Sequence, residues 1–101
     1  MTDRFKVVPP GGTIGIVGGG QLGRMAALCA AAMGYRCHIF CPDTDSPAAQ
    51  VSAKATVASY DDADALDRFA ASVDVITYEF ENLPTASFAQ MDAITPVRPH
   101  W

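Results

Sequence analysis

Apolar and polar positions follow one another in short blocks along this chain, and the blocks predict strands and helices in alternation. Apolar runs bounded by turn residues predict four strands, at residues 13–17, 36–41, 56–58 and 73–80. Residues 95–98 are expected to form the stub of a fifth strand. Apolar residues at helical spacing predict helices at residues 22–33, 61–72 and 84–91. Short alternating elements of this kind favour a parallel sheet built from right-handed βαβ units.

The predicted fold class is α/β, a Rossmann-like open parallel sheet of four or five strands in the order 3-2-1-4-5 with helices on both faces. Residues 1–12 end in Pro-Pro-Gly-Gly, so we expect an N-terminal extension there, followed by one domain over residues 13–101. Ser46, and Asp61 or Asp62, are expected to cap helix starts. The first helix is expected to bury an apolar stripe against the sheet, formed by Leu22, Met25, Ala26, Cys29, Ala32 and Met33.

A glycine turn after the first strand is the strongest local signal for a binding site. Gly18, Gly20 and Gly23 form the pattern G-x-G-x-x-G between an apolar strand and a helix, the context in which that pattern indicates nucleotide binding. Unpaired amides at the start of the helix favour an anion, most often a phosphate. Glycines at these positions also suit a turn that binds nothing, so the pattern alone leaves the ligand open.

Glu79 and Glu81, the only two glutamates of the chain, lie at the end of the fourth predicted strand. Alternation along a strand puts both carboxylates on one face. With the fourth strand beside the first, they flank the glycine turn, where open parallel sheets bind ligands. A phosphate at Gly20-Gln21-Leu22, and sugar hydroxyls or a ring amine at Glu79, would suit a phosphoribosyl ligand. Carboxylates at a strand end also act as turn formers or salt-bridge partners, and that alternative stays open.

Composition and charge exclude several classes of function. The net charge of −4 and the lack of basic clusters argue against a nucleic-acid partner. No apolar run approaches the roughly 20 residues of a membrane span, and the first residues lack a secretory signal. Cys29, Cys37 and Cys41 lack C-x-x-C spacing, and an odd number of thiols favours the cytoplasm. His38 is expected to be packed or exposed and residues 61–64 to be a solvated helix start, so we predict no metal site.

Three motifs in order carry a resemblance to a known family. Residues 18–25 are GGGQLGRM, residues 45–49 are DSPAA and residues 78–82 are YEFEN. Together they resemble the N-terminal, pre-ATP-grasp domain of the 5-(carboxyamino)imidazole ribonucleotide synthetases, ATP-grasp ligases of bacterial and fungal purine biosynthesis. The resemblance extends over residues 13–98 and is far more specific than the glycine pattern alone.

The resemblance implies a ligase that joins bicarbonate to 5-aminoimidazole ribonucleotide with ATP and Mg²⁺, through a carboxyphosphate intermediate. It implies that this domain contributes to the ribonucleotide site, with Gly20, Gln21, Leu22 and Glu79 as substrate-binding residues. In such a ligase, ATP, Mg²⁺ and the bicarbonate chemistry belong to further domains. We therefore expect no catalytic residue or cofactor on this chain, no activity from it alone, and a cytoplasmic homodimer for the full-length enzyme.

The end of the chain departs from the pattern of that family. The sequence stops at Trp101, where the fifth predicted strand should continue, and this predicts a truncated form without the ATP-grasp and C-terminal domains. His100 and Trp101 are expected to have no functional role.

Two other classes of function stay open at this point. A NAD(P)-binding oxidoreductase domain shares the strand–turn–helix signature and expects an acidic residue after the second strand, to hold the ribose hydroxyls. Asp43 lies 20 residues beyond Gly23, but in a loop typical of a turn and a helix cap, and Gln21 and the paired glutamates lack a clear dehydrogenase role. The third class is a non-catalytic ligand-binding module, which only the short length supports.

Overall fold

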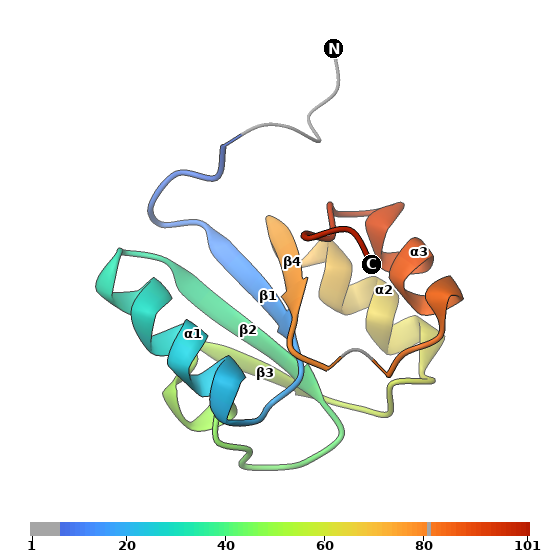
Figure 1. Cartoon of the computed structure of the whole chain (residues 1–101), viewed down its shortest axis with the longest axis horizontal. Coiled ribbons are helices and arrows are strands. Elements are labelled where there is room, and N and C mark those ends of the chain that lie inside the picture. The colour runs from blue at the N-terminus through green and yellow to red at the C-terminus, as the bar shows by residue number, and fades with distance from the viewer. Residues whose placement is uncertain (1–6, 81) are drawn as a thin grey trace.

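The computed structural model describes residues 7–80 and 82–101, and its centre is a parallel sheet (Figure 1). The strands are β1 (Thr13–Val17), β2 (Arg36–Cys41), β3 (Lys54–Val57) and β4 (Val75–Tyr78). They lie in the order β3-β2-β1-β4, and each neighbouring pair is parallel. The predicted class and the predicted order of these strands are confirmed.

Helices cover both faces of this sheet (Figure 1). On one face lies α1 (Gln21–Ala32), with a short 3-10 helix, η2 (Ala49–Val51). On the other lie α2 (Ala63–Ala71) and α3 (Thr85–Asp92), over a core that includes Phe40, Phe69 and Ile76. Within the described part of the chain, no helix is long and apolar enough to cross a membrane.

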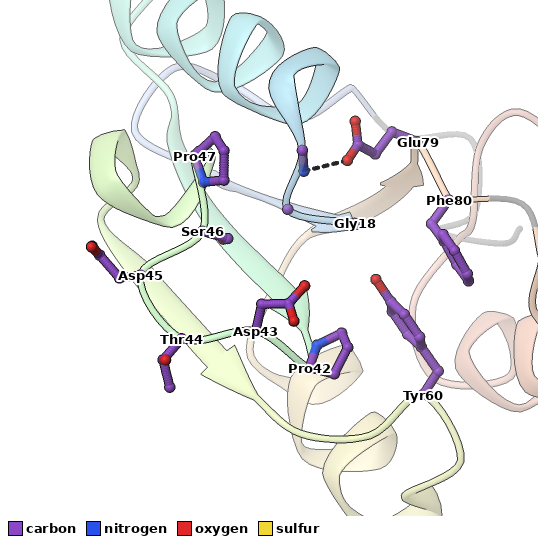
Figure 2. Close-up of a pocket in the computed structure, with 12 residues that line it drawn as sticks. Gly18, Pro42, Asp43, Thr44, Asp45, Ser46, Pro47, Tyr60, Glu79 and Phe80 are labelled. Atoms are coloured by element: carbon purple, nitrogen blue, oxygen red, sulfur yellow. Dashed lines mark hydrogen bonds between the residues drawn. The ribbon is translucent and has the colours of Figure 1, made fainter.

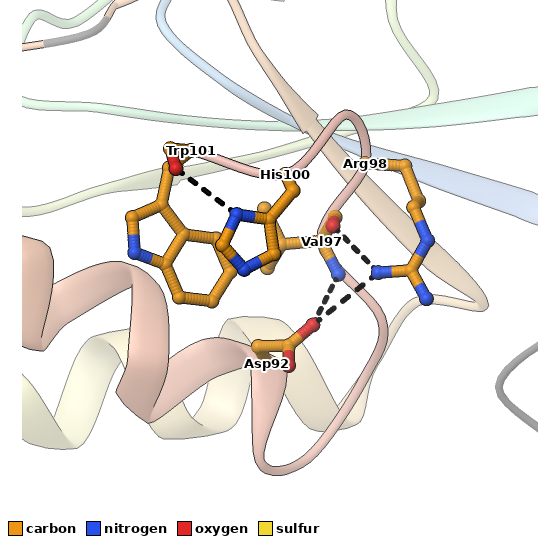
Figure 3. A network of polar contacts seen from close by, with 5 residues as sticks. All are labelled: Asp92, Val97, Arg98, His100 and Trp101. Carbon is orange, nitrogen blue, oxygen red and sulfur yellow. Dashed lines mark hydrogen bonds and ion pairs between the residues drawn. The ribbon is translucent and has the colours of Figure 1, made fainter.

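Val97 occupies the place of the predicted fifth strand, but only as a single bridge. It pairs in parallel with Ile76 of β4, whose amide donates to the carbonyl of Pro96 at 2.9 Å and whose carbonyl accepts from the amide of Arg98 at 2.8 Å. The Asp92 carboxylate at the end of α3 accepts from the amide of Val97 at 2.9 Å and lies 3.6 Å from the Arg98 guanidinium (Figure 3). The sheet therefore has four strands and a fifth position beyond β4.

The predicted buried stripe of α1 is wrong. Leu22, Met25 and Met33 are 69%, 60% and 64% exposed. The residues of α1 that face the sheet are Gly23, Ala27 and Ala30. Small side chains let the helix axis come close to the strands, and larger ones on that side would hold it away. The helix is apolar on both sides, so its apolar pattern alone did not determine which side is buried.

Of the predicted helix caps, that of Asp62 is confirmed, whereas the N-cap residue of η2 is Ala48 and not Ser46. The Asp62 carboxylate accepts from the amide of Ala65 at 3.0 Å at the start of α2. The Ser46 hydroxyl accepts from the amide of Ala49 at 3.3 Å, where the chain enters η2. These contacts satisfy amides that have no acceptor inside a helix.

Two predicted strands have different bounds in the structure. β3 covers Lys54–Val57 instead of residues 56–58, because its pairing with β2 begins where Lys54 lies beside His38. β4 ends at Tyr78 instead of residue 80, because the amides of Glu79 and Phe80 both donate to the carbonyl of Val17, at 3.0 and 3.3 Å. This shared acceptor ends the ladder and directs the chain past the end of β1.

Residues 7–12, part of the predicted N-terminal extension, lie against the connection between α1 and β2. The amide of Gly11 donates to the carbonyl of Gly34 at 2.8 Å, and the Tyr35 hydroxyl donates to the carbonyl of Val8 at 2.7 Å. Residues 1–6 lie outside the described residues. The division into an extension over 1–12 and a domain over 13–101 stays a prediction.

Candidate functional site

The glycine turn and Glu79 lie together at the carboxyl edge of the sheet. Val17 pairs with Tyr78, so Gly18 and Glu79 follow β1 and β4 at the same level. Gly18 has a φ of +117°, and a Cβ built there would overlap Cγ of Glu79. A Cβ on Gly20 would lie 2.8 Å from Oε1 of Glu79. The glycines therefore leave open the space that the Glu79 side chain fills.

The Glu79 carboxylate caps the start of α1. Its Oε1 accepts from the amide of Gly20 at 2.5 Å (Figure 2). Its Oε2 accepts from the amide of Gly23 at 2.8 Å. An anion is favourable here because the helix dipole and the unpaired amides both point toward it. Glu79 thus occupies the amide of Gly20, one of the three residues at which the sequence analysis placed a phosphate. Of the described residues, none accepts from the amides of Gln21 or Leu22.

A cavity of about 650 Å³ opens beside the glycine turn (Figure 2). It is lined by residues 18–20, residues 42–47, Tyr60, Glu79 and Phe80. Three of these side chains are carboxylates, those of Asp43, Asp45 and Glu79, and among the described residues no lysine or arginine lines the cavity. The lining is therefore rich in hydrogen-bond acceptors and poor in positive charge.

The loop of residues 42–47 is held directly against the glycine turn. The amide of Ala48 donates to the carbonyl of Gly19 at 3.0 Å, and a Cβ on Gly19 would lie 2.5 Å from the Ser46 hydroxyl oxygen. The Arg24 guanidinium of α1 donates to the carbonyl of Pro47 at 3.1 Å. These contacts explain why the DSPAA motif forms the side of the cavity opposite Glu79.

A second, smaller cavity of about 440 Å³ lies on the other side of Glu79. Leu22 lines it from α1, and Thr77 and Tyr78 line it from β4. The four predicted site residues are thus divided between two neighbouring cavities. Gly20 lines the larger one, Leu22 the smaller one, Glu79 both, and Gln21 neither.

Asp43, Tyr60 and Phe80 also line the larger cavity. Glu81 lies outside the described residues, so its place beside Glu79 stays a prediction. Asp43 does line the larger cavity, as the oxidoreductase alternative requires. Sequence reasoning missed Tyr60 and Phe80, which follow β3 and β4. The rule that ligands bind beyond the carboxyl ends of parallel strands could have found both.

The cysteines and acidic residues show no sign of a metal centre. Across residues 7–80 and 82–101, no three His, Cys, Asp or Glu side chains are grouped so that they could hold a metal ion. The thiols are free, with Cys29 exposed and Cys37 and Cys41 buried, and burial raises the pKa of Cys37.

His38 is a buried residue of the core, with both ring nitrogens paired. Its Nε2 lies 2.7 Å from the Thr56 hydroxyl, and its Nδ1 lies 3.0 Å from the Ser72 hydroxyl. Because Ser72 donates its proton to the carbonyl of Phe69 at 2.7 Å, it accepts from Nδ1, and Nε2 accepts from Thr56. Burial, with a smaller effect of Lys54, lowers the pKa of His38 from 6.5 to about 4.

The stability of the protein is expected to fall as the pH drops from 6.5 to about 4. Over this range the unfolded state binds a proton at His38 that the folded state does not. The contribution of neutral His38 to the free energy of unfolding, which is present above pH 6.5, is therefore lost. The full loss is about 3 kcal/mol. Urea unfolding of the protein and of His38→Gln at pH 7 and pH 4.5 measures most of this loss. The variant should keep only the part of the pH dependence due to carboxylates, and equal pH dependence in the two proteins would contradict the expectation.

The fold and the site together define a class of protein. A four-stranded parallel sheet in the order 3-2-1-4, with a glycine turn after β1 and a carboxylate after β4 on the amides of that turn, defines a Rossmann-like α/β domain. A family model described as the ribonucleotide synthetase preATP-grasp domain matches residues 12–101. The chain belongs to this family.

Individual relatives support this family assignment. The N5-carboxyaminoimidazole ribonucleotide synthase of Brucella melitensis is 58% identical over 78 residues, which are 77% of this chain and 22% of that protein. The solved Staphylococcus aureus N5-carboxyaminoimidazole synthetase, complexed with ADP, matches with a TM-score of 0.88 and 40% identity over 92% of this chain and 25% of that one.

A third relative was solved with a ribonucleotide. The N5-carboxyaminoimidazole synthase of Aspergillus clavatus, in complex with ADP and 5-aminoimidazole ribonucleotide, matches with a TM-score of 0.80 and 30% identity. The match covers 90% of this chain and 24% of that one. This chain therefore spans about a quarter of the length of these relatives, the part that forms their preATP-grasp domain.

Proposed function

We propose that this domain binds 5-aminoimidazole ribonucleotide for an ATP-dependent ligase that carboxylates this compound with bicarbonate in purine biosynthesis. The observation that carries the proposal is the cavity beside the glycine turn, in which Glu79 is held by the amides of Gly20 and Gly23. The A. clavatus relative, which was solved with this ribonucleotide, supports it. We also propose that the full-length enzyme is a homodimer of the cytoplasm.

The chemistry of the cavity favours the heterocycle and the ribose of the ligand over its phosphate. Asp43, Asp45 and Glu79 present acceptors that suit the amine and the ribose hydroxyls. The same charges repel a phosphate, by about 1 kcal/mol for each pair 4 Å apart even in water. The amides of Gln21 and Leu22 have no acceptor among the described residues and are left to bind an oxygen of the ligand.

The residues of this site do not fit ATP and Mg²⁺. A triphosphate needs lysine or arginine side chains, and the described residues that line the cavity include neither. Arg24, the arginine of α1, donates to the carbonyl of Pro47 and to the Gln50 side chain, the latter at 2.9 Å. In the proposed function, ATP, Mg²⁺ and the carboxylation belong to parts of the ligase outside this domain.

A ligand screen by thermal unfolding tests the proposal. The chain is expected to gain stability with 5-aminoimidazole ribonucleotide, by about 2.7 kcal/mol at a ligand concentration 100 times Kd. Magnesium-ATP serves as the control and should give no gain. Stabilisation by NAD(H) alone would support the oxidoreductase alternative instead. No response to any of these compounds would favour a module with another ligand.

A further inference from the structure

The Tyr60 ring is held at the rim of the larger cavity by a stack on Phe80. The two ring centroids lie 4.5 Å apart and the planes differ by 7°. Phe40 of β2 contacts the Tyr60 ring from the core, with centroids 6.0 Å apart. This packing fixes the direction of the side chain, and Figure 2 shows the Tyr60 hydroxyl pointing into the cavity.

The Tyr60 hydroxyl has no internal partner. No other described residue forms a hydrogen bond with it, whereas the Tyr35 hydroxyl donates to the carbonyl of Val8 at 2.7 Å. Burial, with smaller electrostatic effects of Cys41, Asp43 and Glu79, raises the pKa of Tyr60 to about 12. The hydroxyl therefore keeps its proton at neutral pH and can donate it in a hydrogen bond.

This hydroxyl complements the rest of the cavity. The carboxylates of Asp43, Asp45 and Glu79 accept hydrogen bonds but cannot donate them. A ribonucleotide carries acceptors as well as donors, namely its ring nitrogen and its ribose oxygens. An acceptor buried among carboxylates without a donor would cost binding free energy.

Resting on the proposed function, we infer that the Tyr60 hydroxyl donates a hydrogen bond to a ring nitrogen or ribose oxygen of the bound ribonucleotide. Phe80 lines the same cavity, and its stack on the Tyr60 ring makes it the residue that positions this hydroxyl. The inference adds a neutral donor to a site that the sequence analysis built only from the glycine turn and Glu79.

Calorimetric titration of the chain with 5-aminoimidazole ribonucleotide tests the inference. Tyr60→Phe keeps the ring stack and is expected to weaken binding about fivefold to tenfold, the loss of one hydrogen bond, with an unchanged Tm. Tyr35→Phe is the matched control, since it also removes one hydroxyl. It should lower the Tm and leave the affinity unchanged, because its hydroxyl bonds within the protein.

The outcomes separate this inference from the proposed function. If the unmodified chain binds the ribonucleotide and Tyr60→Phe binds it equally well, the inference is overturned and the proposed function stands. If the unmodified chain does not bind it, both are overturned.

A double-mutant cycle tests the role of Phe80. Phe80→Leu should weaken binding, and adding Tyr60→Phe to it should cause little further loss, because the hydroxyl is then no longer directed into the cavity. Fully additive losses would show that Phe80 does not act through Tyr60.

Discussion

Replacing Glu79 with alanine is expected to destabilise the protein and to abolish binding of the ribonucleotide. The carboxylate accepts from the amides of Gly20 and Gly23, and both amides lose their acceptor in the variant. Hydrogen bonds to a charged group contribute about 1.5–3 kcal/mol each, and water replaces part of this, so we expect a loss of about 3 kcal/mol. For a domain of this size that loss lowers the Tm by about 15 °C.

Two further variants make this experiment specific. Glu79→Gln keeps one acceptor oxygen and should lose less stability than Glu79→Ala. Asp45→Asn also removes a carboxylate from this cavity, but that carboxylate accepts no hydrogen bond from a backbone amide of the described residues. Asparagine tolerates the φ of +53° at this position. The Tm of this variant should therefore be close to that of the unmodified protein. Calorimetry measures the Tm of all three variants. A Glu79→Ala variant as stable as Asp45→Asn would show that the carboxylate does not hold the turn.

The second large effect is expected from Gly18→Ala. The φ of +117° strains any residue with a Cβ, and that Cβ would overlap Cγ of Glu79. The backbone strain costs about 1–2 kcal/mol. Displacing Glu79 adds the loss of its bonds to the glycine turn. We expect a total loss of about 4 kcal/mol, with ribonucleotide binding reduced as in Glu79→Ala.

Gly11→Ala separates the two causes. Gly11 also has a positive φ, +94°, but a Cβ there would have nothing within 4 Å. This variant should show only the backbone strain, about 1 kcal/mol. The measurement is urea unfolding of both variants. Equal losses in Gly11→Ala and Gly18→Ala would mean that the overlap with Glu79 is relieved without cost.

The turn chemistry and one helix cap could be predicted because each depends on a few neighbouring residues. The glycine turn after β1 and the Asp62 cap are both local, and both form as predicted. The strand order could also be predicted, because a parallel sheet with short crossovers allows few topologies. Family membership followed from three motifs in order and is confirmed over residues 12–101.

The orientation of α1 could not be predicted from its pattern. Leu22, Met25 and Met33 form a good apolar stripe, yet the structure buries Gly23 and Ala27. Hydrophobicity favours the larger residues, whereas close packing on the sheet favours the smaller ones. Which effect wins depends on the space left by β1 and β2, which is a property of the assembled fold.

The sequence by itself determined the class of fold, the glycine turn and the presence of an acidic residue at the end of β4. Only the tertiary structure decided what that residue does. The amides of Glu79 and Phe80 share the carbonyl of Val17, and this ends β4 where the Glu79 carboxylate reaches the amides of Gly20 and Gly23. These hydrogen bonds join residues 56 and 59 positions apart, so they depend on the three-dimensional arrangement of β1, β4 and α1. The same arrangement leaves the cavity beside the turn lined by carboxylates, with the Tyr60 hydroxyl as a donor.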